Sequence, residues 1–215
     1  GCNECRCLMS IIQGNAKQGS TRGFYNFPIE QSLRFNDDDS AYLSWTPDSA
    51  GNRKTWTLSF WAKLASVKEY ALFGCGSDGA NYFAIRTDST NNLFVEDAND
   101  YVLKTTQVLR DVSAWYHIVV ALDTTQATAS NRLKIYINGE QVTAFATETY
   151  PALDYATGFW NSTSAHEIGD ANAAGVANFD GYLAEVNFID GQALTADSFG
   201  ELKNGVWIPK DPSGL

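Results

Sequence analysis

Three segments of this chain have the residue pattern of half-buried β-strands. They are residues 55–63 (TWTLSFWAK), 115–122 (WYHIVVAL) and 133–140 (LKIYINGE). In the first and third, apolar residues alternate with other residues at a period of two, which is the side-chain period of a strand. The third contains Asn138-Gly139. Both residue types tolerate positive φ angles, so this pair favours a two-residue hairpin.

The rest of the chain extends this pattern. Shorter strand-like segments follow at regular spacing over residues 69–108, and a last long one covers residues 179–189. The only helix signal covers residues 193–203, where Thr195 suits the N-cap, Asp197 the first turn and Gly205 the exit. Many short strands without alternating helices predict an all-β, antiparallel jellyroll sandwich with one short C-terminal helix.

We expect three regions along the chain. An extended N-terminal arm covers residues 1–31, the jellyroll covers residues 32–203, and an extended tail covers residues 204–215. The arm carries the aromatic residues Phe24, Tyr25 and Phe27. An arm of this kind docks either on its own domain or on a neighbouring protein, so we interpret these three residues as anchoring residues.

Composition and charge narrow the range of partners that this chain can bind. The 215 residues are 44% apolar, which is ample for a packed core, and carry a formal net charge of −10. That charge opposes binding to the phosphate backbone of a nucleic acid. No apolar run approaches the ~20 residues that a membrane-spanning helix needs, and residues 1–10 lack the pattern of a secretory leader. We therefore expect neither a nucleic-acid nor a membrane partner.

The cysteines cluster at the start of the chain. Cys2, Cys5 and Cys7 could supply three thiolates to zinc or an iron–sulfur cluster, but a fourth ligand is missing. The alternative is an extended terminal arm without metal. Met9, the only methionine, suggests either a start site or a region removed by maturation. Cys75 has the surroundings of a small buried residue with a structural role.

The ordered set of strand segments resembles the laminin-G-like, concanavalin A-like jellyroll superfamily over residues 32–203. The quoted features are Ser59-Phe60-Trp61, the segment 115–120, the segment 133–140 and the closing pair 168–170 and 179–186. A narrower resemblance, over residues 31–44, 50–57 and 205–215, is to such domains in structural proteins of tailed, often marine, bacteriophages.

This resemblance implies a non-enzymatic virion protein. Its location would be the virion, as a capsid decoration, head fibre or tail fibre component. Its partners would be a capsid or tail protein and further copies of itself in a homo-oligomer such as a trimer. The alternative that the superfamily offers is a lectin-like module that binds a carbohydrate on the host surface.

No catalytic residues are expected. The glucanases of the superfamily use a Glu-x-Asp-x-x-Glu strand pattern, and this chain lacks it. Glu185 is interpreted as a sandwich residue, and His117 as a packed histidine in an apolar strand. Apart from a metal at the N-terminal cysteines, calcium is the candidate cofactor, because it prefers oxygen ligands and laminin-G-like domains often bind it. The candidate ligands are Asp170, Asn172 and Asp180, whose alternative explanation is that turns favour Asp and Asn.

Carbohydrate or interface contacts are expected from aromatic residues. In the long loop after residue 145 these are Tyr155 and Trp160, with Asn161 as a polar partner. Trp61 lies on the more polar face of its strand, where it belongs either to a second buried layer or to a contact surface. Tyrosine and tryptophan are also enriched at subunit interfaces, so both kinds of ligand remain open.

Overall fold

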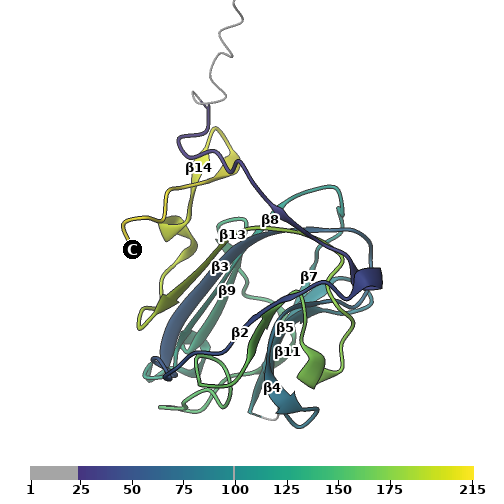
Figure 1. Cartoon of the computed structure of the whole chain (residues 1–215). Helices are drawn as coiled ribbons and strands as arrows, with labels where there is room; N and C mark the ends of the chain where they lie inside the picture. Colours follow the sequence, from purple (N-terminus) through teal and green to yellow (C-terminus); the bar gives the residue numbers. More distant parts are fainter. Residues whose placement is uncertain (1–23, 99) are drawn as a thin grey trace, which may run out of the picture.

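The computed structural model describes residues 24–98 and 100–215 and shows two antiparallel sheets stacked against each other (Figure 1). The six-stranded sheet has the order β1-β13-β3-β8-β9-β10, and the seven-stranded sheet has the order β11-β7-β6-β5-β4-β12-β2. A separate hairpin, β14-β15, follows at the C-terminal end. This arrangement confirms the all-β jellyroll that the strand pattern predicts. Within the described residues, no helix is long and apolar enough to span a membrane.

The strands are β1 (Leu33–Phe35), β2 (Leu43–Trp45), β3 (Thr55–Leu64), β4 (Ala71–Asp78), β5 (Asn81–Thr87), β6 (Asn92–Asp97), β7 (Tyr101–Val108), β8 (Tyr116–Asp123), β9 (Leu133–Ile137), β10 (Glu140–Gln141), β11 (Phe145–Thr149), β12 (His166–Ile168), β13 (Gly181–Asp190), β14 (Gly200–Lys203) and β15 (Val206–Pro209). The short 3-10 turns of the described chain are η1 (Asp37–Asp39), η2 (Ala129–Asn131), η3 (Asn172–Ala174) and η4 (Ala196–Ser198).

The main core lies between the two sheets. Period-two alternation in β3 directs Trp56, Leu58 and Phe60 inward, and all three are almost completely buried. They meet residues of the opposite sheet, including Phe73 and Phe83. Burying a large apolar side chain contributes about 1.5–3 kcal/mol, so this interface is the main stabilising feature of the sandwich.

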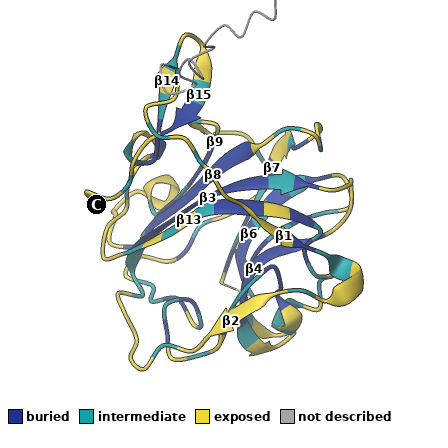
Figure 2. Cartoon of the chain, turned by 45° about the horizontal axis from the view of Figure 1, so that its top comes forward, coloured by how far each residue is buried: buried dark blue, intermediate teal, exposed yellow. Residues whose placement is uncertain are grey.

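A second, smaller core covers the outer face of the six-stranded sheet. It contains Val119, Tyr136, Ala196 and Phe199, with Trp207 packed against it. The central strands β3 and β8 are therefore buried on both faces, whereas β2 at the edge of the other sheet is exposed along its whole length (Figure 2). The C-terminal segment thus acts as a third layer over one sheet.

The C-terminal helix is shorter than its sequence signal indicates. Thr195 makes no side-chain capping hydrogen bond, and the helical part is the three-residue turn η4. Asn204 and Gly205 have φ angles of 51° and 79° and form the turn between β14 and β15. Gly205 therefore lies in a hairpin turn and does not end a helix. Asn-Gly is a favoured pair for such a tight turn.

The hairpin expected at Asn138-Gly139 is confirmed. Their φ angles are 51° and 85°, and Ile137 pairs with Glu140 across the turn. Strand β13 contains a bulge, because its pairing register with β3 shifts between Ala184 and Asn187. Glu185 lies in this bulge with a φ angle of 46°, a region that residues other than glycine rarely adopt.

Candidate ligand-binding groove

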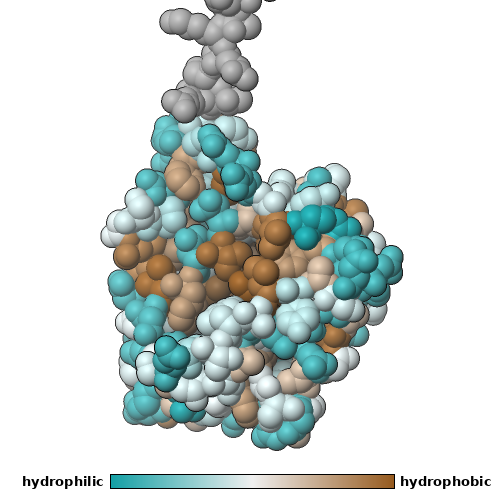
Figure 3. All heavy atoms as spheres, viewed as in Figure 1, coloured by the Kyte–Doolittle hydropathy of each residue, from teal (hydrophilic) through white to brown (hydrophobic). Residues whose placement is uncertain are grey.

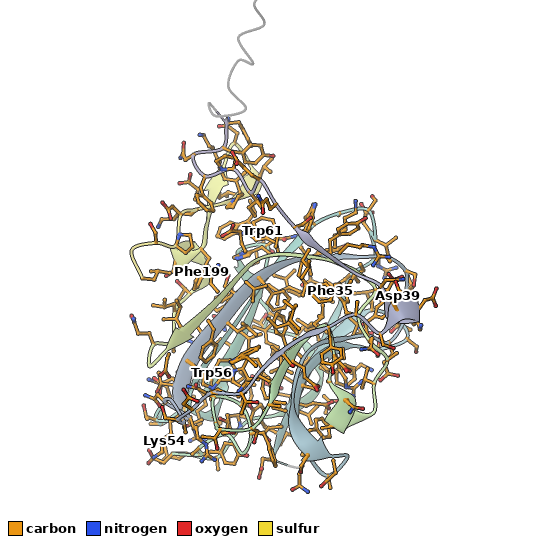
Figure 4. The ribbon with its side chains drawn as sticks, viewed as in Figure 1. Phe35, Asp39, Lys54, Trp56, Trp61 and Phe199 are labelled. Carbon is orange, nitrogen blue, oxygen red and sulfur yellow. The ribbon has the colours of Figure 1, made fainter. Side chains whose placement is uncertain are left out.

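Strand register sets up a row of side chains on the outer face of the six-stranded sheet. Ala184 of β13 is paired with Trp61 of β3, and Trp61 is paired with His117 of β8. The rings of Trp61 and His117 stack with their centroids 4.8 Å apart. Trp207 of β15 stacks on the same imidazole at 5.9 Å. Figure 4 shows Trp61 on this outer side, below the C-terminal hairpin.

Hydrogen bonds fix the protonation of His117. The indole Nε1–H of Trp207 donates to Nδ1 of His117 over 2.9 Å, so Nδ1 carries no proton. Nε2 therefore carries the proton and donates to the hydroxyl oxygen of Ser59 at 2.9 Å. Burial lowers the pKa of His117 to about 4, so the ring is neutral at physiological pH. His117 is a packed and hydrogen-bonded histidine, as its apolar strand indicates.

Two glycines make room for the Trp207 ring. A Cβ atom at Gly139 would lie 2.4 Å from Cε3 of Trp207, and one at Gly200 would lie 2.5 Å from its Cε2. No real Cβ approaches a neighbour so closely. The two hairpin regions thus fix the position of Trp207 above the sheet.

Beside this row lies a groove with a volume of about 450 Å³. We call it the aromatic groove. Its lining consists of Tyr25, Pro28, Ile29, Glu30, Gln31, Ser32, Trp61, Trp115, Ala184, Trp207 and Pro209. The N-terminal arm forms one wall, the sheet forms the floor, and the C-terminal strand β15 forms the other wall. Figure 3 shows apolar side chains gathered on this side of the molecule, below the C-terminal hairpin.

The described part of the N-terminal arm docks on its own domain. Asn26 donates its side-chain N–H to Glu201 at 2.7 Å and accepts from Lys203 at 3.3 Å. Phe24 and Tyr25 pack edge to face at 5.1 Å. Of the three expected anchoring residues, Tyr25 lines the aromatic groove, and Phe27 lines an adjacent hollow with Glu185. Cys2, Cys5, Cys7 and Met9 lie outside the described residues.

Trp160 is not a contact residue, and that expectation is wrong. It is 1% exposed and packs against Trp56, Phe73 and Phe83 in the main core. The loop bends inward there because Thr157 donates its hydroxyl to the Trp160 carbonyl at 2.6 Å. Asn161 is half-buried and bonds Asp190 and the Asn52 carbonyl, so its amide is already engaged.

Tyr155 of the same loop contacts two aspartates at the turn between β6 and β7, the buried Asp97 and the exposed Asp100. Its hydroxyl lies 2.6 Å from Asp100 and 3.2 Å from Asp97. Burial raises the pKa of Asp97 to about 6, and Asp97 also accepts the backbone N–H of Gly158. Because Asp97 is 2% exposed, its contacts with Tyr155 and Gly158 tie this loop to the end of strand β6.

The three calcium candidates have different surroundings. Asp180 pairs with Arg34 at 2.5 Å. Asn172 lines a hollow at the rim of the sandwich, where Asp78 and Glu167 also contribute. Burial raises the pKa of Glu167, with a further contribution from Asp170. Among the described residues, no three His, Cys, Asp or Glu side chains are grouped to hold a metal. Calcium stays a prediction, and the rim hollow adds Glu167, which the sequence did not predict, to its candidate ligands.

The other residues singled out in the sequence have structural environments. Cys75 is buried, and burial raises the pKa of its thiol to about 12, so it is not reactive at neutral pH. His166 accepts the Asn161 backbone N–H and donates to the Ser164 carbonyl. Glu185 lies at the bulge next to the arm.

Two residues of the groove, Trp115 and Trp207, were not predicted from the sequence as contact residues. Trp115 is 38% exposed and contacts Tyr182. Strand periodicity was a usable signal for it, because residues 115 and 117 share a face of their strand. Trp207 had no comparable signal, because its position depends on the fold of the C-terminal hairpin.

The two stacked antiparallel sheets, with an open groove on the outer face of one, define a lectin-like β-sandwich. A family model described as the concanavalin A-like lectin/glucanases superfamily matches residues 37–198. The chain therefore belongs to this superfamily. No curated protein sequence matches the chain significantly.

Solved structures share the fold. The mouse laminin alpha1 chain, domains LG4-5, is 11% identical with a TM-score of 0.53, over 79% of this chain and 44% of that one. A heptameric SAP-like pentraxin from Limulus polyphemus is 16% identical with a TM-score of 0.50, over 79% and 76%. A mutant NanB sialidase from Streptococcus pneumoniae is 15% identical with a TM-score of 0.50, over 80% and 28%. At these identities the likeness concerns the fold alone.

Proposed function

We propose that this chain is a non-enzymatic structural protein of a bacteriophage virion, in a capsid decoration, head fibre or tail fibre. The observation that carries the proposal is the position of the attachment elements. The N-terminal arm, the aromatic groove and the C-terminal hairpin all lie on the outer face of the six-stranded sheet. One face of the domain is thus aromatic and bordered by the arm that continues to residues 1–23.

The outer face of the seven-stranded sheet has the opposite character. Arg86 pairs with Glu69 and with the buried carboxylate of Glu96, and Lys104 pairs with Asp88. Phe94 lies between the cations of Arg86 and Lys104. The cores of protein interfaces are depleted of charged residues and enriched in aromatic residues. This contrast supports attachment through the groove side, with the charged sheet turned to solvent.

The test uses the phage particle that encodes this chain. Mass spectrometry of purified particles should find the chain, and cryo-electron microscopy should place the jellyroll with the groove side toward a neighbouring protein. A chain lacking residues 1–23 should bind the particle more weakly than the full chain. Absence of the chain from purified particles contradicts the virion role.

Carbohydrate binding is the second candidate, and the aromatic groove favours it. Sugar sites combine aromatic platforms with polar partners, and here Trp115 and Trp61 lie close to Gln31 and Ser32. A glycan array with the whole chain tests this function. Binding that is lost in Trp115→Ala and kept in Trp45→Ala supports it. Release of reducing sugar from a bound glycan would contradict the non-enzymatic proposal.

A further inference from the structure

We propose that the aromatic groove receives a basic side chain, arginine or lysine, from a polypeptide segment of a neighbouring virion protein. This inference rests on the attachment function proposed above and names the chemistry of the partner. The site is assembled by the arm, the sheet floor and strand β15, which together form a groove of about 450 Å³.

Charge is the first argument. The groove and the adjacent hollow have two charged residues in their described lining, Glu30 and Glu185, and both are acidic. The whole chain carries a net charge of −10. A cation is therefore attracted to the groove at long range and paired at its rim.

The aromatic rings are the second argument. Cations bind over the faces of aromatic rings, and tryptophan is the best such partner. Three tryptophans line the groove, Trp61, Trp115 and Trp207. Trp115 is 38% exposed and offers the accessible ring, whereas Trp61 is buried against His117. An arginine guanidinium is planar, so it stacks on an indole while its N–H groups reach a carboxylate.

The surrounding surface already uses this chemistry within the chain. Arg34 lies over the ring of Tyr182, with its Cζ 5.3 Å from the centroid, and Tyr182 packs edge to face against Trp115. Lys203 lies over Phe24. Asp180 and the Gly181 carbonyl hold Arg34 in place. The Arg34 guanidinium is therefore paired outside the groove.

The engaged indole N–H of Trp207 favours a cation over a sugar as the ligand. Sugar hydroxyls need donors as well as acceptors, and an indole N–H is the usual donor of tryptophan. The N–H of Trp207 is already given to His117. What Trp207 offers to a ligand is ring surface, which suits a cation. The bulge at Glu185 is consistent with this use, because bulges redirect side chains next to binding sites.

The experiment measures peptide binding to the full chain by fluorescence anisotropy. The probe is a labelled six-residue peptide of alternating alanine and arginine, and its matched control replaces each arginine with neutral, isosteric citrulline. We expect the arginine peptide to bind at least about tenfold more tightly. Raising NaCl from about 50 to about 300 mM should weaken it several-fold.

Variants locate the site. Trp115→Ala should weaken the arginine peptide about tenfold, and Glu30→Gln should weaken it about three- to tenfold. The matched controls are Trp45→Ala, an exposed tryptophan on strand β2, and Glu140→Gln, an exposed glutamate on strand β10. Both controls should bind like the unmodified chain.

Equal binding of the citrulline peptide, or full binding by Trp115→Ala, overturns the proposal. So does the absence of arginine-peptide binding at millimolar concentration. Glycan-array binding that is independent of salt and lost in Trp115→Ala assigns the groove to a sugar and also overturns it. The virion role is judged separately, by whether the chain is present in purified particles, so the two proposals can fail independently.

Discussion

Trp207 donates its indole N–H to Nδ1 of His117 over 2.9 Å, and the two rings stack with an angle of 24° between them. This contact joins the last strand of the chain to a central strand of the six-stranded sheet, 90 residues away in sequence. It fixes the tautomer of a buried imidazole and forms part of the groove wall. Stability and site geometry therefore depend on the same pair.

Trp207→Phe tests this pair. The substitution keeps an aromatic ring but leaves Nδ1 of His117 buried without a donor, which costs about 1–2 kcal/mol in unfolding free energy. Urea denaturation followed by circular dichroism measures the loss. Trp45→Phe, at an exposed tryptophan on β2, is the matched control and should cost less than about 0.5 kcal/mol. Equal stability of Trp207→Phe and the unmodified chain would show that the hydrogen bond contributes nothing.

Gly139→Ala tests the close approach of the hairpin to Trp207. The new methyl group would clash with the indole, and the φ angle of 85° adds backbone strain. We expect Gly139→Ala to cost about 2–4 kcal/mol in unfolding free energy in the otherwise unmodified chain. When Trp207→Ala is also present the clash is gone, and the remaining backbone strain should cost only about 1–2 kcal/mol. A double-mutant cycle of denaturation curves gives the difference. If the losses in unfolding free energy are additive, Gly139 is not needed to make room for the Trp207 indole.

Two buried groups with opposite pH effects give the next prediction. The pKa of His117 is lowered from 6.5 to about 4, so its contribution to stability is lost as pH falls from 6.5 to 4. The pKa of Asp97 is raised from 3.8 to about 6, so its contribution is lost as pH rises from 3.8 to 6. Each of these two pKa shifts corresponds to about 3 kcal/mol of unfolding free energy. Between pH 6 and 4 the two contributions largely offset each other.

Asp97→Asn should remove this compensation. Asparagine can still accept from Tyr155 and Gly158 but binds no proton in this range. The variant should therefore lose about 3 kcal/mol more than the unmodified chain between pH 6 and pH 4, measured by urea denaturation. Asp48→Asn, in an exposed loop, is the control and should keep the original pH profile. If Asp97→Asn and the unmodified chain have parallel pH profiles, Asp97 does not titrate in this range.

Trp160→Ala tests the assignment of this residue to the core. Removing a fully buried indole should cost about 3–5 kcal/mol in unfolding free energy. Trp115→Ala, at the exposed groove, should cost about 1 kcal/mol or less. The two variants separate core from contact surface, because only Trp115→Ala should change ligand binding at near-normal stability. A stable Trp160→Ala chain would contradict the core assignment.

Calcium binding at the sandwich rim predicts a change in melting temperature. EDTA should lower the Tm by several degrees, and added calcium should restore it. Glu167→Gln should abolish this dependence, because Glu167 lines the rim hollow with Asn172. Asp180→Asn is the control, because Asp180 is paired with Arg34, so it should change the Tm without changing its response to calcium. A Tm that is the same with EDTA and with calcium removes the calcium hypothesis.

Much of the fold could be predicted from local pattern. Alternation located β3 and β9, and Asn138-Gly139 located a hairpin, because these features are encoded within a few neighbouring residues. The turn at Asn204-Gly205 carries the same signal, but the helix-like context before it masked that signal. The bulge at Glu185 could not be predicted, because it depends on how β13 pairs with β3 along its length.

The candidate site was less predictable, because it is assembled from distant segments. Trp61 was placed on the more polar face of its strand, where the structure buries it to 8% exposure against His117 at the floor of the groove. Trp160 was misplaced, because a loop rich in polar residues can still insert one side chain into a core. Trp207 becomes part of the groove through contacts that only the folded hairpin creates.

The third layer over the six-stranded sheet has a consequence for synthesis on the ribosome. The chain is made from its N-terminus, and Trp207 follows every strand of the two main sheets in the sequence. Until residues 206–209 leave the exit tunnel, no strand β15 can form to cover His117 and Val119, although every strand of the two main sheets has already been made. A nascent chain at that stage therefore exposes the part of the apolar sheet face that Trp207 covers in the folded protein.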